Sequence, residues 1–184
     1  MKPIYIFSIF IILVLAQLFV PASMILHQED ILERGTAYKF KTQPIDPADP
    51  FKGKYIRLNY DINSMPSTDS TWVSQEDIYI MLTTDRLGFA KIRQVLRDIP
   101  ADGDYVKAKV DWYNVYEKEV TFSLPFEEFY MNEDKAYNAE LAHTEAQRDS
   151  LSTTYALVYV LEGDGVLENV YINDIPIATY VEED

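Results

Sequence analysis

The most regular pattern in the chain is an apolar run near its N-terminus. Residues 3–26 contain no charged side chain, and Ile4 to Val20 is almost continuously Ile, Leu, Val and Phe. A helix over this run reaches roughly 36 Å at about 1.5 Å per residue, which exceeds the hydrocarbon core of a bilayer at about 30 Å. The run predicts a transmembrane helix. Glu29–Arg34 then predicts a short helical stem that ends at Gly35.

Beyond the stem, the hydrophobic pattern changes to the two-residue period of β-strands. Val106, Ala108, Val110 and Trp112 share one face of a predicted strand, while Lys and Asp residues occupy the other face, which is typical of a half-buried antiparallel strand. Segments of this kind are rich in β-branched and aromatic residues and are separated by Gly, Asp and Pro turns. We expect strands over Thr36–Gln43, Tyr55–Asn63, Asp77–Thr84, Phe89–Ile99, Tyr105–Tyr116, Val120–Phe129, Thr154–Glu162 and Val166–Asn173.

One late segment has the composition of a helix. Glu133–Asp149 is rich in Ala, Glu and Gln and lacks Gly and Pro, and Asn132 precedes it as a candidate N-cap. Its apolar stripe is weak, so we expect it to lie on the sheet surface with one face inward. The expected stripe consists of Ala136, Tyr137, Leu141 and Ala142.

Together these elements predict a mainly β protein in two parts. Residues 1–27 form a transmembrane anchor, and residues 28–184 form an antiparallel β domain, either a sandwich or a partly open barrel, with one late helix. The length of the chain fits one such domain, since domains typically have about 100–150 residues.

The distribution of charge predicts the side of the membrane on which the domain lies. Lys2 precedes the apolar run, and Glu29 and Asp30 follow it, so the positive-inside rule leaves the N-terminus in the cytoplasm and the domain outside the cytoplasmic membrane. A cleavable signal peptide is the alternative, because Val20–Ala22 has small residues suited to a peptidase. Retention is favoured, since the run exceeds the usual signal core of about 7–15 residues and Met24–Leu26 continues it.

Overall composition narrows the classes of partner. Lys+Arg number 16 against Asp+Glu 30, a formal net charge of −14, so repulsion from phosphates makes nucleic acid an unsuitable partner. The chain has no cysteine, which excludes disulfides, thiolate metal ligands and a thiol nucleophile. We therefore expect no cofactor, and a partner that is another membrane or envelope protein.

Several segments carry groups that are able to bind or react. The proline-rich stretch Pro44–Pro50 contains Asp46 and Asp49. These aspartates either bind a cation or act as an acid/base pair, or they belong to a wide turn in which they bond nearby backbone amides. We favour the turn. His143 follows Glu140 by three residues on the predicted helix, and we interpret them as an exposed ionic pair and not as a metal site.

The segment after the proline-rich stretch separates into two faces. If Tyr55 to Ile62 is a strand, the apolar side chains of Ile56, Leu58, Tyr60 and Ile62 share one face, while Tyr55, Arg57 and Asn59 share the other. We expect the first set to face the core. Tyr55 then either closes over the proline-rich stretch or forms a contact surface with Arg57.

Gly53–Tyr60, which reads GKYIRLNY, resembles the motif that names the GDYXXLXY family of bacterial proteins. The Pro44–Pro47 stretch, Phe129–Glu133 and the closing strands Ala156–Asn173 are similar to that family as well, although Lys54 replaces the family's Asp. The resemblance implies a membrane-anchored domain outside the cytoplasm and no particular activity. On residues and resemblance together, the candidate binding residues are Asp46, Asp49, Gly53, Tyr55, Arg57 and Glu133.

Two classes of function fit these observations. The first is a non-catalytic binding or assembly module at the outer face of the membrane. The alternative is an envelope hydrolase that uses two carboxylates. With 30 acidic residues, sequence spacing selects no particular pair, so the binding module is the preferred interpretation.

Overall fold

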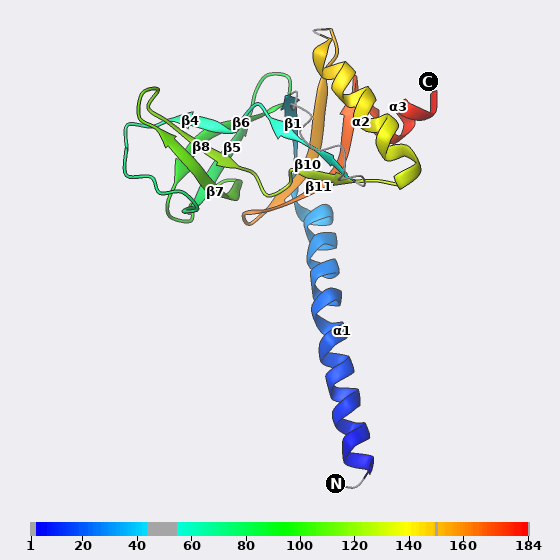
Figure 1. Cartoon of the computed structure of the whole chain (residues 1–184). Helices are drawn as coiled ribbons and strands as arrows, with labels where there is room; N and C mark the ends of the chain where they lie inside the picture. Colours follow the sequence, from blue (N-terminus) through cyan, green and yellow to red (C-terminus); the bar gives the residue numbers. More distant parts are fainter. Residues whose placement is uncertain (1–2, 44–54, 150, 184) are drawn as a thin grey trace.

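The structure is a computed structural model that describes residues 3–43, 55–149 and 151–183. A single long helix, α1 (Pro3–Arg34), projects from a β-rich domain (Figure 1). It is long and apolar enough to cross a membrane, with a mean hydropathy of 2.6 in its most apolar window. The predicted stem is therefore the continuation of this helix and not a separate element.

Helix α1 ends where the sequence predicts, at Gly35. The amide of Gly35 donates a hydrogen bond of 2.8 Å to the carbonyl of Ile31, and a Cβ at this position would lie 2.4 Å from the same oxygen. A side chain larger than hydrogen is thus excluded by the backbone of the last helical turn.

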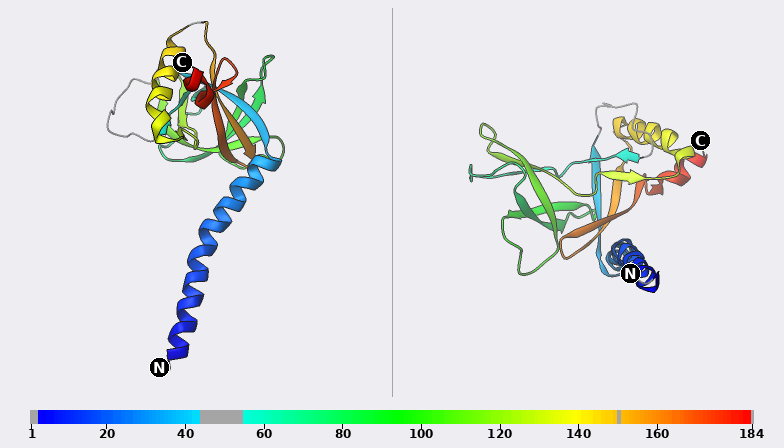
Figure 2. Two further views of the ribbon diagram at one scale, coloured as in Figure 1. Left: turned by 90° about the vertical axis from the view of Figure 1, so that its right-hand side faces the viewer. Right: turned by 60° about the horizontal axis from the view of Figure 1, so that its bottom comes forward.

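The first sheet forms the half of the domain nearest to α1, and its strands lie in the order β12-β11-β10-β1-β3. Two helices, α2 and α3, lie together beside it (Figures 1 and 2). The elements are β1 (Thr36–Gln43), β3 (Asn59–Tyr60), β10 (Thr154–Leu161), β11 (Asp164–Ile172), β12 (Ile175–Pro176), α2 (Glu133–Arg148) and α3 (Ile177–Glu183).

The second sheet forms the other half, in the order β4-β8-β7-β5-β6. It curls until its edge strands β4 and β6 contact each other, which makes a nearly closed barrel. The elements are β4 (Ser64–Pro66), β5 (Asp77–Thr84), β6 (Ala90–Leu96), β7 (Tyr105–Asn114) and β8 (Glu119–Ser123); a two-stranded ribbon of β2 (Tyr55–Arg57) and β9 (Glu128–Tyr130) completes the fold. All strand pairs are antiparallel.

One continuous core extends through both halves. The structure confirms the predicted mainly β fold, its antiparallel strands and its late helix. Of the two predicted architectures, the second half of the domain has that of a partly open barrel. The predicted inward residues Val106, Ala108 and Val110 of β7 are buried, and alternating apolar residues are buried in the same way in β5, in β8 and in the connection after it: Ile78, Ile80, Leu82, Val120, Phe122, Leu124 and Phe126.

Several elements differ from the prediction. The expected strand Val120–Phe129 is divided into β8 and β9 around Pro125, which cannot donate to a ladder. A register shift in β7 between Val110 and Trp112 reverses the alternation, so Trp112 is 55% exposed instead of buried. The sequence analysis also did not anticipate β4, β12 or α3.

Helix α2 is confirmed, and Asn132 is its N-cap residue as predicted. Its inward face was predicted only in part: Ala142 packs against the core, but other members of the expected stripe do not lead that face. The buried residues are Ala139, His143 and Ala146, whereas Leu141 is 47% exposed. Asn132 forms no side-chain cap hydrogen bond. The interpretation of His143 as exposed was wrong: its ring is buried between α2 and the first sheet, where its partners are the Thr42 hydroxyl and the Gln147 side-chain amide.

Candidate functional site

The segment that follows residue 54 connects the two halves of the domain. Its first part, β2, pairs with β9, and the next residue, Leu58, donates its amide to the carbonyl of Glu127 at 2.7 Å. Its middle part, β3, pairs with β1, and its last part, β4, pairs with β8. The expected single strand Tyr55–Asn63 is therefore a chain of short strands, because its pairing partner changes along its length.

The inward face of this segment is the one that the alternation predicts. The exposed fractions are 2% for Ile56, 1% for Leu58, 2% for Tyr60 and 9% for Ile62. The Tyr60 hydroxyl donates a hydrogen bond of 2.6 Å to the carbonyl of Phe126, and burial raises the pKa of Tyr60. This face is part of the core, whereas Arg57 on the opposite face is exposed.

On the opposite face, Arg57 extends toward Glu127. A guanidinium nitrogen of Arg57 lies 3.7 Å from a carboxylate oxygen of Glu127, and the Arg57 side chain is 70% exposed. Burial raises the pKa of Glu127; Arg57 opposes this rise and the negative charge of Asp111 adds to it. Glu127 is therefore a carboxylate that is incompletely solvated and only partly neutralised by its cation.

An open hollow of about 350 Å³ lies beside this pair. Its rim includes Glu128, which accepts a hydrogen bond of 2.6 Å from the hydroxyl of Tyr130. Tyr130 is 65% exposed and stands opposite Tyr55 in the register of β2 and β9. The hollow is lined by Leu124, Pro125, Phe126, Glu127, Glu128 and Tyr130. An exposed aromatic ring next to charged groups is a combination that is common where one protein binds the polar surface of another.

The structure places only some of the predicted site residues. Arg57 does not line the hollow, but it pairs with Glu127, which does. Tyr55 lies in β2 and Glu133 begins α2, and these two elements contact each other, but the description of the chain does not extend to their side chains. Asp46, Asp49 and Gly53 lie outside the described residues. Sequence reasoning missed Glu127, whose only signal is its place directly after a buried apolar run.

The buried His143 is a structural group beside this region. Its Nε2 atom lies 3.1 Å from the hydroxyl of Thr42 and 3.2 Å from the amide nitrogen of Gln147, and Thr42 donates a hydrogen bond of 2.8 Å to the hydroxyl of Thr154. Burial lowers the pKa of His143 to about 4, so the ring is neutral near pH 7.

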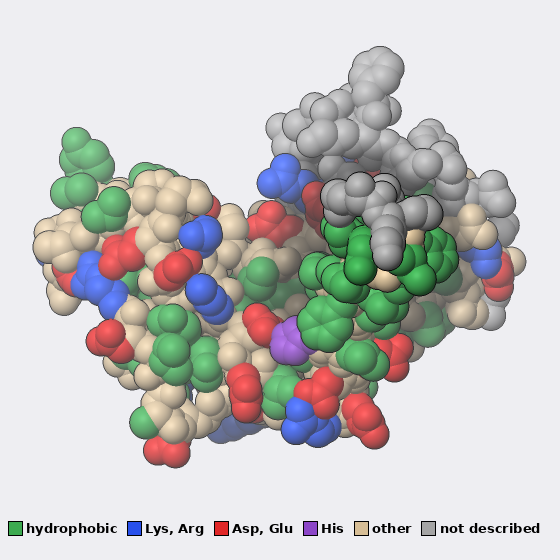
Figure 3. Space-filling view, turned by 90° about the horizontal axis from the view of Figure 1, so that it is seen from below, with side chains coloured by type: hydrophobic (Ala, Val, Ile, Leu, Met, Phe, Trp, Pro, Cys, Tyr) green, Lys and Arg blue, Asp and Glu red, His purple; other side chains and the backbone are tan. Residues whose placement is uncertain are grey.

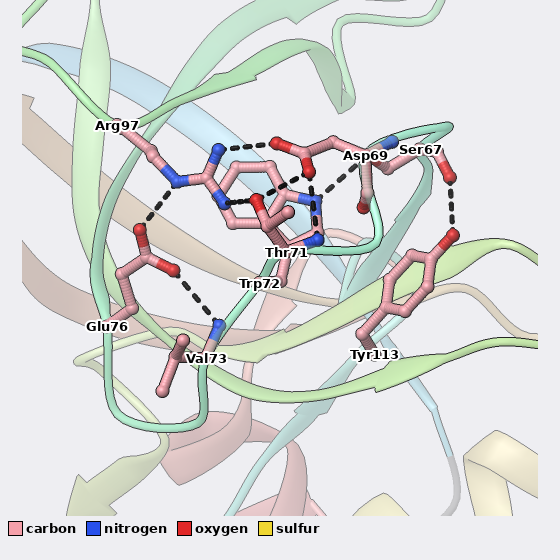
Figure 4. Close-up of polar contacts among 8 residues, drawn as sticks. All are labelled: Ser67, Asp69, Thr71, Trp72, Val73, Glu76, Arg97 and Tyr113. Atoms are coloured by element: carbon pink, nitrogen blue, oxygen red, sulfur yellow. Dashed lines mark hydrogen bonds and ion pairs between the residues drawn. The ribbon is translucent and has the colours of Figure 1, made fainter.

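A second polar cluster fixes the loop between β4 and β5, and Figure 4 shows it. Arg97 stacks over the ring of Trp72 at 4.0 Å and donates hydrogen bonds to Asp69, Glu76 and Thr71. Burial of Trp72 against the core holds the loop beside the barrel. The cluster includes Ser67, whose hydroxyl accepts from the Trp72 ring at 2.9 Å.

The internal contacts of this second cluster explain its geometry. Asp69 accepts hydrogen bonds from the Thr71 hydroxyl, from Arg97 and from the Thr71 amide, which lower the pKa of Asp69 to about 2. Glu76 accepts from the Val73 amide and from Arg97, which lower the pKa of Glu76 as well. We interpret this cluster as a structural clamp. Among the described residues, no group of three or more His, Asp or Glu is arranged to hold a metal ion.

Comparison with known proteins gives one match. The model of a family described as GDYXXLXY protein matches residues 17–170. No curated protein matches the chain, and no solved structure matches it. The matched range includes much of α1, the segment that joins the two halves and the Arg57–Glu127 pair.

Proposed function

The chain belongs to the GDYXXLXY protein family, and we propose that it is a membrane-anchored binding or assembly module whose domain lies outside the cytoplasmic membrane and contacts another membrane or envelope protein. The observation that carries the proposal is the junction between α1 and the domain. The helix continues without a break from its apolar span into the base of the fold.

Two contacts fix this junction. Ile31, in the last turn of α1, is 1% exposed, and the ring of His27 lies 2.9 Å from a carboxylate oxygen of Asp164 at the tip of the β10–β11 hairpin. A domain attached in this way has a defined orientation to its helix. A defined orientation supports a role in which one face must meet a neighbouring protein in the same membrane.

The appearance of the molecule from the helix side agrees with this placement. Figure 3 shows α1 covered with apolar side chains, while the domain behind it carries charged groups, many of them carboxylates. Leu26 is the last residue of the apolar run, and only the remaining turns of α1 separate it from Gly35. If the run spans the bilayer, the base of the domain lies close to the lipid headgroups.

Membrane insertion is tested by washing membranes that contain the full chain with alkaline carbonate. We expect the chain to stay with the membrane, because a spanning helix is held by apolar burial and not by charge. Release of the intact chain contradicts the anchor, and a mature N-terminus near Ser23 shows that the run is a cleaved signal peptide.

Orientation is tested with introduced cysteines, since the chain contains none of its own. Tyr116, which is 97% exposed, is replaced with cysteine in the domain. In a second variant, a cysteine is inserted directly after Met1 so that Lys2 and its charge are kept. A membrane-impermeant maleimide applied from outside should label Y116C and spare the second variant. The reverse labelling contradicts the proposed side.

The contact surface is tested by photo-crosslinking in native membranes. A photoreactive residue replaces either Tyr130, at the hollow, or Tyr116, a matched exposed tyrosine on the barrel. We expect a discrete adduct from position 130 that is weakened by Arg57→Ala, with no such adduct from position 116. Identical adducts from both positions contradict a specific surface at the hollow.

A further inference from the structure

Near the middle of its uncharged run, helix α1 carries a polar side chain, Gln17, that the helix does not satisfy. Ser8 and Ser23 donate their hydroxyls to the carbonyls of Ile4 at 2.9 Å and Val20 at 2.7 Å. Gln17, by contrast, is exposed on the helix surface, and within the described part of the chain its amide forms no hydrogen bond. It lies near the middle of the uncharged run 3–26.

The backbone at the same position also lacks a partner. In an α-helix the carbonyl of residue 17 accepts from the amide of residue 21, but residue 21 is the proline inside α1 and has no N–H. The backbone carbonyl and the side-chain amide of Gln17 thus both lack a hydrogen-bond partner within the helix. In hydrocarbon neither group has water to bond, so both favour a neighbouring helix that supplies the missing donors and acceptors.

We propose that α1 pairs with α1 of a second copy of this chain through Gln17. The inference rests on the proposed membrane span. Copies inserted with the same orientation have position 17 at the same depth, so two helices that pair through this face bring each Gln17 beside its counterpart. A primary amide is both donor and acceptor, and its N–H groups are able to reach the carboxamide oxygen or the free backbone carbonyl of the partner's Gln17.

Charge does not prevent this pairing. The formal charge of −14 makes two domains repel each other, but the Debye length is only about 8 Å at physiological ionic strength. The repulsion between groups separated by more than that distance is therefore screened. The expected dimer is of moderate strength, since a hydrogen bond between helices in a membrane contributes modestly to association.

The face of the helix is tested with single cysteines in the full chain, in membranes under mild oxidation. Leu13 lies about 40° from Gln17 around the helix axis, and Leu15 lies about 160° from it. Both are exposed leucines, so they are matched positions. We expect a disulfide-linked dimer from L13C and little from L15C; equal crosslinking of the two variants overturns the proposal.

The role of the amide is tested by energy transfer between labelled full-length chains in lipid vesicles. Gln17→Leu should lower the dimer association constant about 3- to 30-fold, as expected for lost interhelical hydrogen bonds. The double variant L15Q/Q17L keeps the composition and moves the amide to the other face, away from the free carbonyl. It should lower association in the same way, and an unchanged association constant in both variants overturns the proposal.

Failure of the membrane span is distinguishable from failure of the pairing. If alkaline carbonate releases the full chain from membranes, the span and the pairing are both wrong. If the chain is retained but remains monomeric, or if L13C is crosslinked to a different protein in place of its own copy, the pairing alone is wrong and the proposed anchor stands.

Discussion

The phenolic hydroxyl of Tyr60 donates a hydrogen bond of 2.6 Å to the backbone carbonyl of Phe126, and the rings of the two residues also meet edge to face at 5.5 Å. This relationship joins β3 of the first sheet to the connection between β8 and β9. Phe40 packs on both rings, at 5.7 Å from Tyr60 and 5.0 Å from Phe126, so the three aromatics link the two halves of the core.

Removing the Tyr60 hydroxyl should cost stability without changing the shape of the core. Tyr60→Phe leaves the Phe126 carbonyl buried without this donor, and we expect a loss of about 1–3 kcal/mol in the free energy of unfolding. The measurement is urea unfolding of a chain that begins at Gln28 and so retains Ile31. Tyr116→Phe, at a position that is 97% exposed, is the control and should change stability by less than about 0.5 kcal/mol.

Leu58 should be among the most sensitive positions in the same segment. Its side chain is 1% exposed, and Leu58→Ala leaves a cavity where β2 gives way to β3, so we expect a loss of about 2–5 kcal/mol. The unfolding midpoint in urea reports it. Little or no change would mean that Leu58 does not face the core.

His143 should make the stability of the domain depend on pH. Its folded pKa is lowered to about 4 from the ordinary 6.5, so below pH 6.5 the unfolded chain binds a proton that the folded chain excludes. The stabilisation is complete above pH 6.5 and is lost as the pH falls from 6.5 toward 4. The expected loss is about 3 kcal/mol.

The contribution of His143 is isolated by comparison with His143→Gln. Unfolding free energies of both chains are measured in urea from pH 4 to pH 7.5. The difference between them should change by about 3 kcal/mol over this range. If the unfolding free energies of the two chains change with pH in parallel, His143 is not a buried neutral group and the original prediction of an exposed His143 is right.

Arg97 should hold the loop between β4 and β5 against the barrel. Arg97→Ala removes the stacking on Trp72 and the hydrogen bonds to Asp69 and Glu76, and we expect it to destabilise the domain by about 1–2 kcal/mol. Limited proteolysis should show faster cleavage within residues 67–76. Arg93→Ala is the matched control, because Arg93 is exposed on β6 and should change stability by less than about 0.5 kcal/mol. Equal protease resistance in both variants contradicts the clamp.

Gly163 should tolerate no side chain, for two separable reasons. Its φ is +96° in the two-residue turn between β10 and β11, and an added Cβ would lie 2.6 Å from the ring of Tyr105. Gly88 has a φ of +84° with nothing within 4 Å of an added Cβ, so Gly88→Ala measures the backbone strain alone, about 1 kcal/mol. Gly163→Ala should cost about 1–3 kcal/mol more, as overpacking does. Equal losses for the two variants would mean that Tyr105 moves aside freely.

The sequence by itself determined the features that depend on a local period. The uncharged run predicted α1, and Gly35 predicted its end. Alternation predicted that Ile56, Leu58 and Tyr60 face inward, because side chains of a strand change face at every residue whatever the strand pairs with. The motif Gly53–Tyr60 also indicated the family that the match over residues 17–170 confirms.

Only the tertiary structure decided the features that depend on residues far apart in the chain. The buried His143 ring is bonded to the Thr42 hydroxyl on β1, which is bonded in turn to Thr154 on the neighbouring strand β10, and no period within α2 reveals these partners. Glu127 is a candidate site residue because the pairing of β9 with β2 brings it beside Arg57. The sequence does not show this pairing. Trp112 is exposed because β7 shifts register against β8. Side-chain burial and pairing register are set by the partner strand, and the partner strand is chosen by the packing of the whole core.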